Sequence, residues 1–369
     1  MKRFLVCFAA VACACITATA HAAKPKPKAV SCGATFGVIS PVTGAAAVIG
    51  QEIVNWTRLS VANWNKAHHT HFSLVEGDDQ LSAAEASTLA QQFASNSKIV
   101  ATVGPAASQN VAAAAPILNK AHIAMVSPSA TATNLTIGAT FHDFFRVVAR
   151  DDEQGPTAAN YIINQLHPKQ VMVVDDQSSF STGLAESATP VFQKAGVTVD
   201  RESVAQTATD YSSLVAKAGS ADVIFLTWQL PANIKLFVQQ MHAQGKTTPT
   251  FASTFDGGTD YVSSFSVNAH TYAPDASLTK QYEKVYGTNY TGQFGPPSYV
   301  SAQVIMTAAG KLCAAHKKIT RTAMLAAIRK VKLKTSIIGR PISFDANGDL
   351  VGGKFYIYKL VNGNYQLVQ

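Results

Sequence analysis

Short runs of apolar, mostly β-branched residues alternate along the chain with longer segments whose apolar positions recur every three or four residues. The first pattern indicates a buried strand, and the second indicates a helix with one apolar face. In the first part of the chain they predict strands at 34–39, 71–76, 98–103 and 123–126 and helices at 50–64 and 83–94. Strands that alternate with helices are typical of crossover units in a parallel sheet. The pattern therefore predicts an α/β domain.

The same alternation restarts near residue 150. It predicts helices at 155–166, 183–195, 211–218 and 232–244 and strands at 171–175, 197–200, 223–227 and 250–252. Helices at 299–316 and 321–331 follow, and then two strands separated by Asn362 and Gly363, a pair that favours a hairpin turn because both residues tolerate positive φ. This last part forms no third domain, so we expect the chain to cross back and complete two lobes. Ligands of parallel sheets bind at the carboxyl ends of strands, which predicts a site in the cleft between the lobes.

The amino terminus has the order of a secretory signal. Lys2 and Arg3 precede an uncharged run at 4–20, and Ala20-His21-Ala22 offers small residues for cleavage. We expect residues 1–22 to be a signal peptide cleaved after Ala22, residues 23–30 to be a solvated spacer, and the mature protein to be periplasmic without a membrane span. Lipidation at Cys13 or Cys15 is the alternative.

Removal of the signal leaves two cysteines, Cys32 and Cys313. In an oxidising compartment two cysteines suggest one disulfide. The alternative is two separate thiols, because the sequence does not show whether the two residues come within bonding distance.

Length and charge narrow the class of protein. A chain of 369 residues is longer than one hydrophobic core usually supports, which again favours two domains. Charged residues make up 14% of the sequence and the net charge is +8, but the basic residues are dispersed and form no stripe interleaved with aromatics. This composition argues against nucleic acid as a partner.

Catalytic and metal-binding signatures are missing from the sequence. It contains no nucleophile elbow, zinc-protease motif, phosphate-binding loop or dinucleotide fingerprint. The histidine cluster at His68, His69 and His71 lacks a carboxylate at the spacing of a metal ligand. The segment from Asp345 resembles the start of a calcium-binding loop, but Tyr356 stands where such a loop needs its bidentate glutamate. We therefore expect no enzyme activity, no metal and no cofactor.

Hydroxyl-rich and glycine-rich turns follow three of the predicted strands, at 40–44, 104–108 and 127–131. Backbone N–H groups and the positive end of a helix dipole at such turns suit a carboxylate. Ordinary helix capping by Ser and Thr is the alternative interpretation for each turn taken singly. Three turns in one half favour a binding site.

These turns, together with the motifs at 37–39, 154–159, 210–215 and 338–350, resemble one family over nearly the whole mature chain. The sequence is similar to the type I periplasmic binding proteins of ABC transporters, especially the branched-chain amino acid (Leu/Ile/Val) group. The resemblance implies a two-lobed Venus-flytrap α/β fold with a parallel sheet in each lobe and a three-segment hinge. It implies a first lobe near 30–149 and 272–336 and a second lobe near 150–271 and 337–369. It also implies that both cysteines lie in the first lobe, which favours the disulfide.

The resemblance further implies roles for single residues. Ser108 and Thr131 would hold a ligand carboxylate, the Ser129 carbonyl would receive an ammonium group, and Phe180 would form an aromatic lid. The sequence departs from the family pattern where Ile49 replaces a tyrosine and where Trp228 and Gln229 stand at an aromatic position. Asp256 is the nearest candidate for the acidic partner of an ammonium group. We expect Trp228 and Tyr299 to form apolar walls of the site, with packing in a lobe core or the hinge as the alternative.

By this resemblance the protein is a monomer that captures a small amino acid, or a related carboxylate or amide, by hinge closure and delivers it to an ABC transporter permease. Two other functions remain open: a periplasmic sensor that signals to a membrane receptor, and a secreted enzyme. The departures from the family pattern leave the recognition of an α-amino group open.

Overall fold

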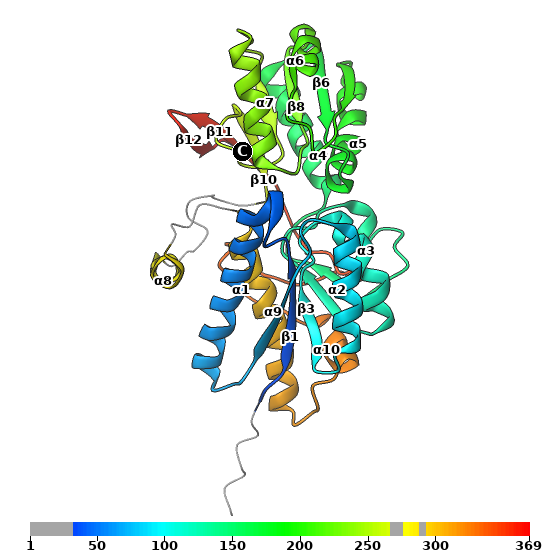
Figure 1. Ribbon diagram of the computed structural model, residues 1–369, viewed down its shortest axis with the longest axis vertical. Helices are drawn as coiled ribbons and strands as arrows, with labels where there is room; N and C mark the ends of the chain where they lie inside the picture. The colour runs from blue at the N-terminus through cyan, green and yellow to red at the C-terminus, as the bar shows by residue number, and fades with distance from the viewer. Residues whose placement is uncertain (1–31, 266–275, 288–292) are drawn as a thin grey trace, which may run out of the picture. The chain divides into compact units, whose positions relative to one another are not determined.

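The computed structural model describes residues 32–265, 276–287 and 293–369, and it is built around two β-sheets (Figure 1). The predicted signal peptide and spacer lie outside the described residues. The first sheet has five strands in the order β2-β1-β3-β4-β5, all parallel. They are β1 (Thr35–Ser40), β2 (Ser73–Asp78), β3 (Ile99–Val103), β4 (Ala124–Ser127) and β5 (Phe144–Arg146).

Helices cover both faces of the first sheet, as Figure 1 shows. On one face lie α1 (Ala47–His68), α9 (Gly295–Ala314) and α10 (Arg321–Ile328), and on the other lie α2 (Ala83–Ser95) and α3 (Ser108–Lys120). Successive residues of a strand pack against opposite layers of helices: Val38 packs towards α1 and α9, whereas Ile39 packs towards α2 and α3. This explains why the strands read as continuous apolar runs.

The second sheet has seven strands among the described residues, in the order β12-β11-β10-β9-β8-β6-β7. The strands β6 (Gln170–Asp175), β7 (Thr198–Ser203), β8 (Val223–Leu226), β9 (Thr250–Ala252) and β10 (Tyr261–Ser264) are parallel. The closing hairpin of β11 (Tyr356–Val361) and β12 (Asn364–Leu367) adds two antiparallel strands. Its turn has positive φ at both Asn362 and Gly363, as the sequence predicts.

The second sheet is covered in the same way as the first. One core contains side chains of α4 (Asp151–Tyr161) and α5 (Ser179–Lys194), and the other contains side chains of α6 (Ser212–Lys217) and α7 (Pro231–Ala243). Strand β6 divides its residues between them, with Val171 and Val173 in the first core and Met172 and Val174 in the second. The predicted α/β class is confirmed.

The chain passes three times between the two sets of elements. Judged from the described elements, the first passage follows β5, the second lies between β10 and α8 (Ala276–Tyr286), whose Leu278 and Tyr282 are buried in the first-sheet core, and the third precedes β11. Before the third passage, Ile338, Ile342 and Leu350 are buried in the core that contains α1 and α9. The expected boundary at residue 337 puts these side chains in the second lobe, whereas their packing is with the first sheet.

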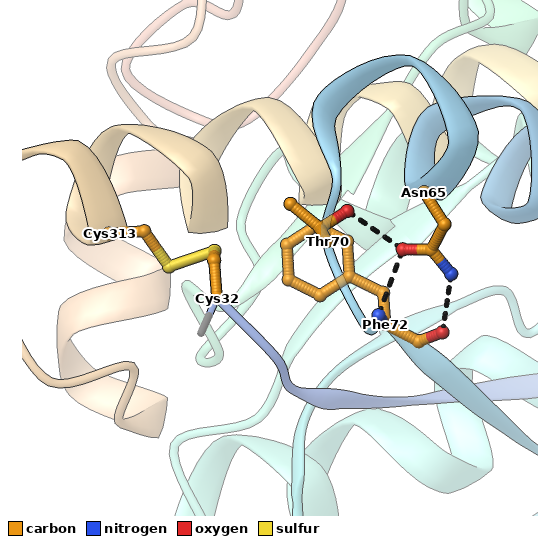
Figure 2. The surroundings of a disulfide bond; sticks show 5 residues. All are labelled: Cys32, Asn65, Thr70, Phe72 and Cys313. Carbon is orange, nitrogen blue, oxygen red and sulfur yellow. Dashed lines mark hydrogen bonds between the residues drawn. A yellow bond between two sulfur atoms is a disulfide. The ribbon is translucent and has the colours of Figure 1, made fainter. Parts of the chain in front are cut away.

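A disulfide joins Cys32, just before β1, to Cys313 near the end of α9, with the Cα atoms 5.8 Å apart (Figure 2). Close by, Asn65 of α1 fixes the turn into β2. Its Oδ1 accepts hydrogen bonds from the Thr70 hydroxyl at 2.8 Å and the Phe72 N–H at 2.9 Å, and its Nδ2 donates to the Phe72 carbonyl at 2.8 Å. The first strand is thus linked covalently to the helix that covers it.

Candidate functional site

A cavity of about 60 Å³ lies where the carboxyl ends of strands from both sheets meet. This volume is several times the roughly 10–15 Å³ that one water molecule requires. Its wall is formed by residues that follow β1, β2, β3, β4, β6, β8, β9 and β10, by Gln154 of α4 and by residues preceding α9. The lining residues are Pro41, Ala46, Ile49, Leu81, Ala106, Ala107, Ser108, Ser129, Thr131, Gln154, Phe180, Gln229, Leu230, Ser253, Thr254, Phe265, Gln293 and Phe294.

Of the eight binding residues predicted from the sequence, five lie in this wall: Ser108, Ser129, Thr131, Phe180 and Gln229. The first three come from the turns after β3 and β4, Phe180 comes from the first turn of α5, and Gln229 follows β8. The rule that places binding residues after parallel strands therefore brings these side chains together. Their role as ligand contacts stays a prediction.

Trp228 does not line the cavity. Its side chain is fully buried in the core between the second sheet and α7, with its ring centroid 5.0 Å from that of Tyr211 and 5.6 Å from that of Phe237. Along an extended segment successive side chains point in opposite directions. Gln229 therefore faces the cavity, and Trp228 faces the core.

Tyr299 and Asp256 also lie away from the cavity wall. Tyr299 of α9 packs in the first-sheet core, with its ring centroid 6.1 Å from that of Trp56. Asp256 holds its own loop, because its Oδ1 accepts hydrogen bonds from the Gly258 N–H at 2.6 Å, the Thr259 N–H at 2.9 Å and the Tyr365 hydroxyl at 2.9 Å. These bonds satisfy its carboxylate, which corrects the expectation that Asp256 faces the ligand.

The first turn of α3 forms the most polar part of the wall. Ser108 is the first helical residue, so the N–H groups of Ser108 and Gln109 have no acceptor within the helix and carry the positive end of its dipole, whereas the Asn110 N–H donates to the Ala107 carbonyl at 3.1 Å. The Ser108 hydroxyl accepts a hydrogen bond from the Ala132 N–H at 3.2 Å, and the Ser129 hydroxyl donates to the Ala106 carbonyl at 2.7 Å. These two bonds hold the turns after β3 and β4 together beside the helix end. The arrangement suits an anion.

Gly104 allows this turn to approach β1. Its φ is +84°, and a Cβ atom at this position would lie 2.3 Å from the Ile39 carbonyl oxygen. The following bond, Gly104-Pro105, is a cis peptide. A side chain at residue 104 would displace the turn that leads into α3.

Two neighbouring aspartates fix the apolar rim of the cavity. Asp78 Oδ1 accepts hydrogen bonds from the N–H groups of Val42 at 2.9 Å and Gln80 at 3.0 Å, and Asp79 Oδ1 accepts from the Leu81 N–H at 3.1 Å. Gln80 and Leu81 both have positive φ, which is uncommon for residues with side chains. Burial raises the pKa of Asp79 to about 6. The pair thus orients the cavity residues Pro41 and Leu81.

None of the cavity's described lining residues carries an ionisable side chain. One acid beside this wall is Asp151, which follows the loop of Thr131 and donates its own N–H to the Thr131 carbonyl at 2.9 Å. Its carboxylate is buried, and neither oxygen has a hydrogen-bond partner within 3.5 Å in the described part of the chain. Burial raises the pKa of Asp151 to about 7, against the lowering effects of the Thr131 hydroxyl and the Arg146 guanidinium.

A second buried acid, Glu52, contacts the backbone next to the lining residue Phe294. Glu52 of α1 accepts a hydrogen bond from the Gly295 N–H at 2.8 Å and therefore caps the start of α9. Burial raises the pKa of Glu52 to about 8, although its backbone hydrogen bonds to Gly295 and Phe294 act in the opposite direction. Near neutral pH this carboxyl is largely protonated and adds little charge to the site.

Most of the wall that comes from the second half of the chain was not predicted from the sequence. Ser253 and Thr254 directly follow the predicted strand at 250–252, so the same rule of polar residues after strands identifies them. Gln154 holds this turn, since its Nε2 donates to the Ser253 carbonyl at 3.1 Å and to the Ser263 hydroxyl at 2.9 Å. Phe265, Gln293 and Phe294 come from segments without a strand signal of their own.

The described residues contain neither a candidate membrane span nor a metal-binding cluster. No helix in this part of the chain is long and apolar enough to cross a membrane. No group of three or more His, Cys, Asp or Glu side chains within the same residues is arranged to hold a metal ion.

Similar proteins agree with this architecture. Residues 33–364 match the family model described as periplasmic binding protein. An amino acid binding protein of Pseudomonas aeruginosa is 28% identical over 278 residues, which are 71% of this chain and 73% of that protein. A Leu/Ile/Val-binding protein homologue of Brucella melitensis is 26% identical over 345 residues, which are 89% of this chain and 92% of that protein.

Solved structures show the same fold at lower identity. The leucine binding protein LivK of Thermotoga maritima superposes with a TM-score of 0.79 at 22% identity, over 91% of this chain and 98% of that one. A solute binding protein of an R. palustris ABC transporter, in complex with benzoate, has a TM-score of 0.75 at 18% identity, over 91% of this chain and 95% of that one. The family match, these relatives and the two sheets that share one cavity show that the chain belongs to the periplasmic binding proteins, as a two-lobed type I member of the branched-chain amino acid group.

Proposed function

We propose that this protein is the extracytoplasmic solute-binding component of an ABC importer and that it captures a small carboxylate with an apolar body. The observation that carries the proposal is the composition of the cavity. A helix amino terminus meets a largely apolar wall, and no described residue of that wall is charged. Such a site offers hydrogen-bond donors to an anion and apolar contact to the rest of the ligand.

The carboxylate end of the ligand belongs at the start of α3. The first-turn N–H groups and the helix dipole supply donors and positive potential, and Ser108 and Thr131 line the same end of the cavity. The apolar body then lies against the three aromatic side chains Phe180, Phe265 and Phe294. Aromatic rings supply much contact area for a small apolar group.

An α-ammonium group would lack a direct acidic partner in this wall. The Asp256 carboxylate is satisfied by its own loop and by Tyr365. A buried charge without a partner costs several kcal/mol, so a ligand without the ammonium group is favoured. The benzoate complex of a structural neighbour shows that one protein of this fold takes such a ligand.

A branched-chain amino acid is the second candidate, and one observation favours it. Asp151 lies behind Thr131 with both carboxylate oxygens unpartnered among the described residues. If the ammonium group of such a ligand reached the Asp151 carboxylate beside Thr131, it would offset the negative charge of that carboxylate. Structural neighbours from Streptococcus pneumoniae and Desulfitobacterium hafniense are complexes with isoleucine and leucine.

Delivery requires release as well as capture. We place the described residues 32–149, 276–287 and 293–350 in the first lobe and 151–265 and 356–369 in the second, because Ile342 and Leu350 pack with the first sheet. Closure of the lobes over the ligand is favoured when the closed form gains contacts that the open form lacks. A transporter permease would then accept the closed form, whereas a sensor would present it to a receptor.

A thermal-shift screen of residues 23–369 tests the ligand class. The panel pairs amino acids with the corresponding acids that lack the ammonium group and adds benzoate, phenylacetate and neutral amides. A ligand that binds only the folded state raises the unfolding midpoint. The proposal expects shifts with the simple carboxylates. Shifts with the amino acids alone would support the Asp151 alternative, and shifts with neutral amides alone would exclude both.

A further inference from the structure

A reciprocal pair of amide hydrogen bonds spans the rim of the cavity. Gln109 belongs to the first turn of α3, which packs on the first sheet, and Gln229 follows β8 of the second sheet. Nε2 of Gln109 donates to Oε1 of Gln229 at 3.0 Å, and Nε2 of Gln229 donates back to Oε1 of Gln109 at 3.4 Å. Gln229 lines the cavity, whereas Gln109 lies outside the set of lining residues.

The orientation of the Gln229 amide is determined by groups of the second sheet alone. Oδ2 of Asp176 accepts hydrogen bonds from the Gln229 backbone N–H at 2.7 Å and from Nε2 of Gln206 at 3.1 Å. Because a carboxylate accepts but does not donate, the nitrogen of Gln206 must face Asp176. The same nitrogen donates to Oε1 of Gln229 at 3.1 Å, which turns the oxygen of Gln229 towards Gln206.

The loop that carries Gln206 is also held in place, since Nδ2 of Asn233 donates to the Gln206 carbonyl at 2.7 Å. A hydrogen-bonded unit within the second lobe is thus formed by Asp176, Gln206 and Gln229, and it needs no group of the first lobe. Gln109 is the member of this network that comes from α3. Its addition satisfies both the oxygen and the nitrogen of the Gln229 amide.

We propose that Gln109 is a latch residue that holds the lobes closed by pairing with Gln229, and that it does so without touching the ligand. This inference rests on the capture-by-closure function proposed above. The side chain of Gln109 makes no other hydrogen bond recorded among the described residues, so the folding of α3 does not depend on it. The latch is uncharged, and its strength should vary little with salt.

Ligand dissociation rates test the latch. The experiment compares wild type, Gln109→Ala and Gln92→Ala, with the tightest ligand of the screen, by stopped-flow displacement. Gln92 is an exposed glutamine of α2 on the same sheet and serves as the matched control. Loss of two neutral hydrogen bonds at Gln109 should raise the dissociation rate roughly tenfold. The association rate and the unfolding midpoint of the ligand-free protein should remain within experimental error of wild type.

A second variant checks the chemistry of the pair. In Gln109→Glu a carboxylate that cannot donate faces the oxygen of Gln229, and we expect dissociation at least as fast as in Gln109→Ala. A dissociation rate within twofold of wild type in Gln109→Ala would overturn the latch. A slower association with unchanged dissociation would also overturn it, because that result indicates a residue needed for capture.

Failure of the proposed ligand class is distinguishable from failure of the latch. If wild type binds no member of the panel, the ligand proposal fails, and the latch is then tested in the double variant Gln109→Cys/Gln229→Cys. A short bismaleimide, whose span suits the backbone separation of two glutamines paired through their side chains, should join these two residues in peptide mapping, and the pair Gln92→Cys/Gln229→Cys should stay unjoined. Absence of the first cross-link would overturn the latch.

Discussion

Nε of Arg146 donates to Oδ1 of Asp349 at 2.7 Å, and this ion pair is almost completely buried where two passages of the chain run side by side. The other carboxylate oxygen, Oδ2, accepts from Nη1 of Arg150 at 2.7 Å and from the Thr136 hydroxyl at 2.9 Å. Arg146 ends β5 and Arg150 precedes α4, whereas Asp349 precedes the return of the chain to β11. One carboxylate thus holds the first and third passages together.

Asp349→Asn should therefore destabilise the protein strongly. It leaves the buried Arg146 guanidinium without its hydrogen-bonded carboxylate, and desolvation already lowers the pKa of this group. Breaking a buried pair in this way typically costs about 3–5 kcal/mol. Urea denaturation measures the loss. Asp152→Asn breaks only the partly exposed pair with Arg150 and should cost less than about 1 kcal/mol. Equal losses in the two variants would contradict the central role of Asp349.

Removal of the disulfide should lower stability without changing the site. Cys32 and Cys313 are separated by 281 residues in sequence, and the double variant Cys32→Ser/Cys313→Ser releases this constraint on the unfolded chain. The expected loss is about 2–5 kcal/mol, measured by denaturation of both proteins under the same conditions. Ligand affinity should be unchanged, because neither cysteine lines the cavity. A parallel loss of affinity would mean that the disulfide also supports the site.

The sequence predicts β1, β3, β6 and β8 well because these strands are almost wholly buried runs rich in β-branched residues. Helix α3 was not predicted, since its apolar positions are mostly alanines and contrast little with their neighbours. Strands β5 and β10 were not predicted, because neither is a run of β-branched residues: β5 is Phe144-Phe145-Arg146, and β10 ends in Ser263 and Ser264. Helix α1 begins at Ala47 rather than at residue 50, because the stretch before Gly50 is small and weakly patterned.

The candidate site was predictable where it follows a strand of the first sheet. Ser108, Ser129 and Thr131 stand in turns that the strand pattern locates. Trp228 and Tyr299 were assigned to the wall because of their size, but size alone does not decide which way a side chain points. Asp256 illustrates a different limit, because its partner Tyr365 is 109 residues away in sequence.

Stability should fall as pH rises through the range in which Glu52 ionises. Burial raises its pKa from 4.5 to about 8, so between these values the folded protein binds a proton that the unfolded chain has lost. The free energy of unfolding then decreases with rising pH, and the decrease ends above about pH 8. Glu52→Gln removes this contribution, so the free energy of unfolding of the variant should rise relative to that of wild type between about pH 5 and pH 8. A constant difference between the two proteins would contradict the raised pKa.

The turn at the start of α3 should control affinity. Ser108→Ala removes a hydroxyl beside the proposed carboxylate, and hydrogen bonds to charged groups contribute about 1.5–3 kcal/mol. The double variant Ser108→Ala/Thr131→Ala should weaken binding by roughly 10- to 100-fold or more, measured by isothermal titration. Thr88→Ala, an exposed hydroxyl of α2, serves as the control and should bind like wild type. Wild-type affinity in the double variant would place the ligand elsewhere.

The most direct test of the central claim compares leucine with 4-methylpentanoate, two ligands that differ only in the α-ammonium group. Because the described cavity wall contains no charged side chain, burial of that group should cost several kcal/mol. Isothermal titration at neutral pH should then give 4-methylpentanoate an affinity at least tenfold higher than that of leucine. Tighter binding of leucine would contradict the account and would indicate that a carboxylate, most directly Asp151, reaches the ligand.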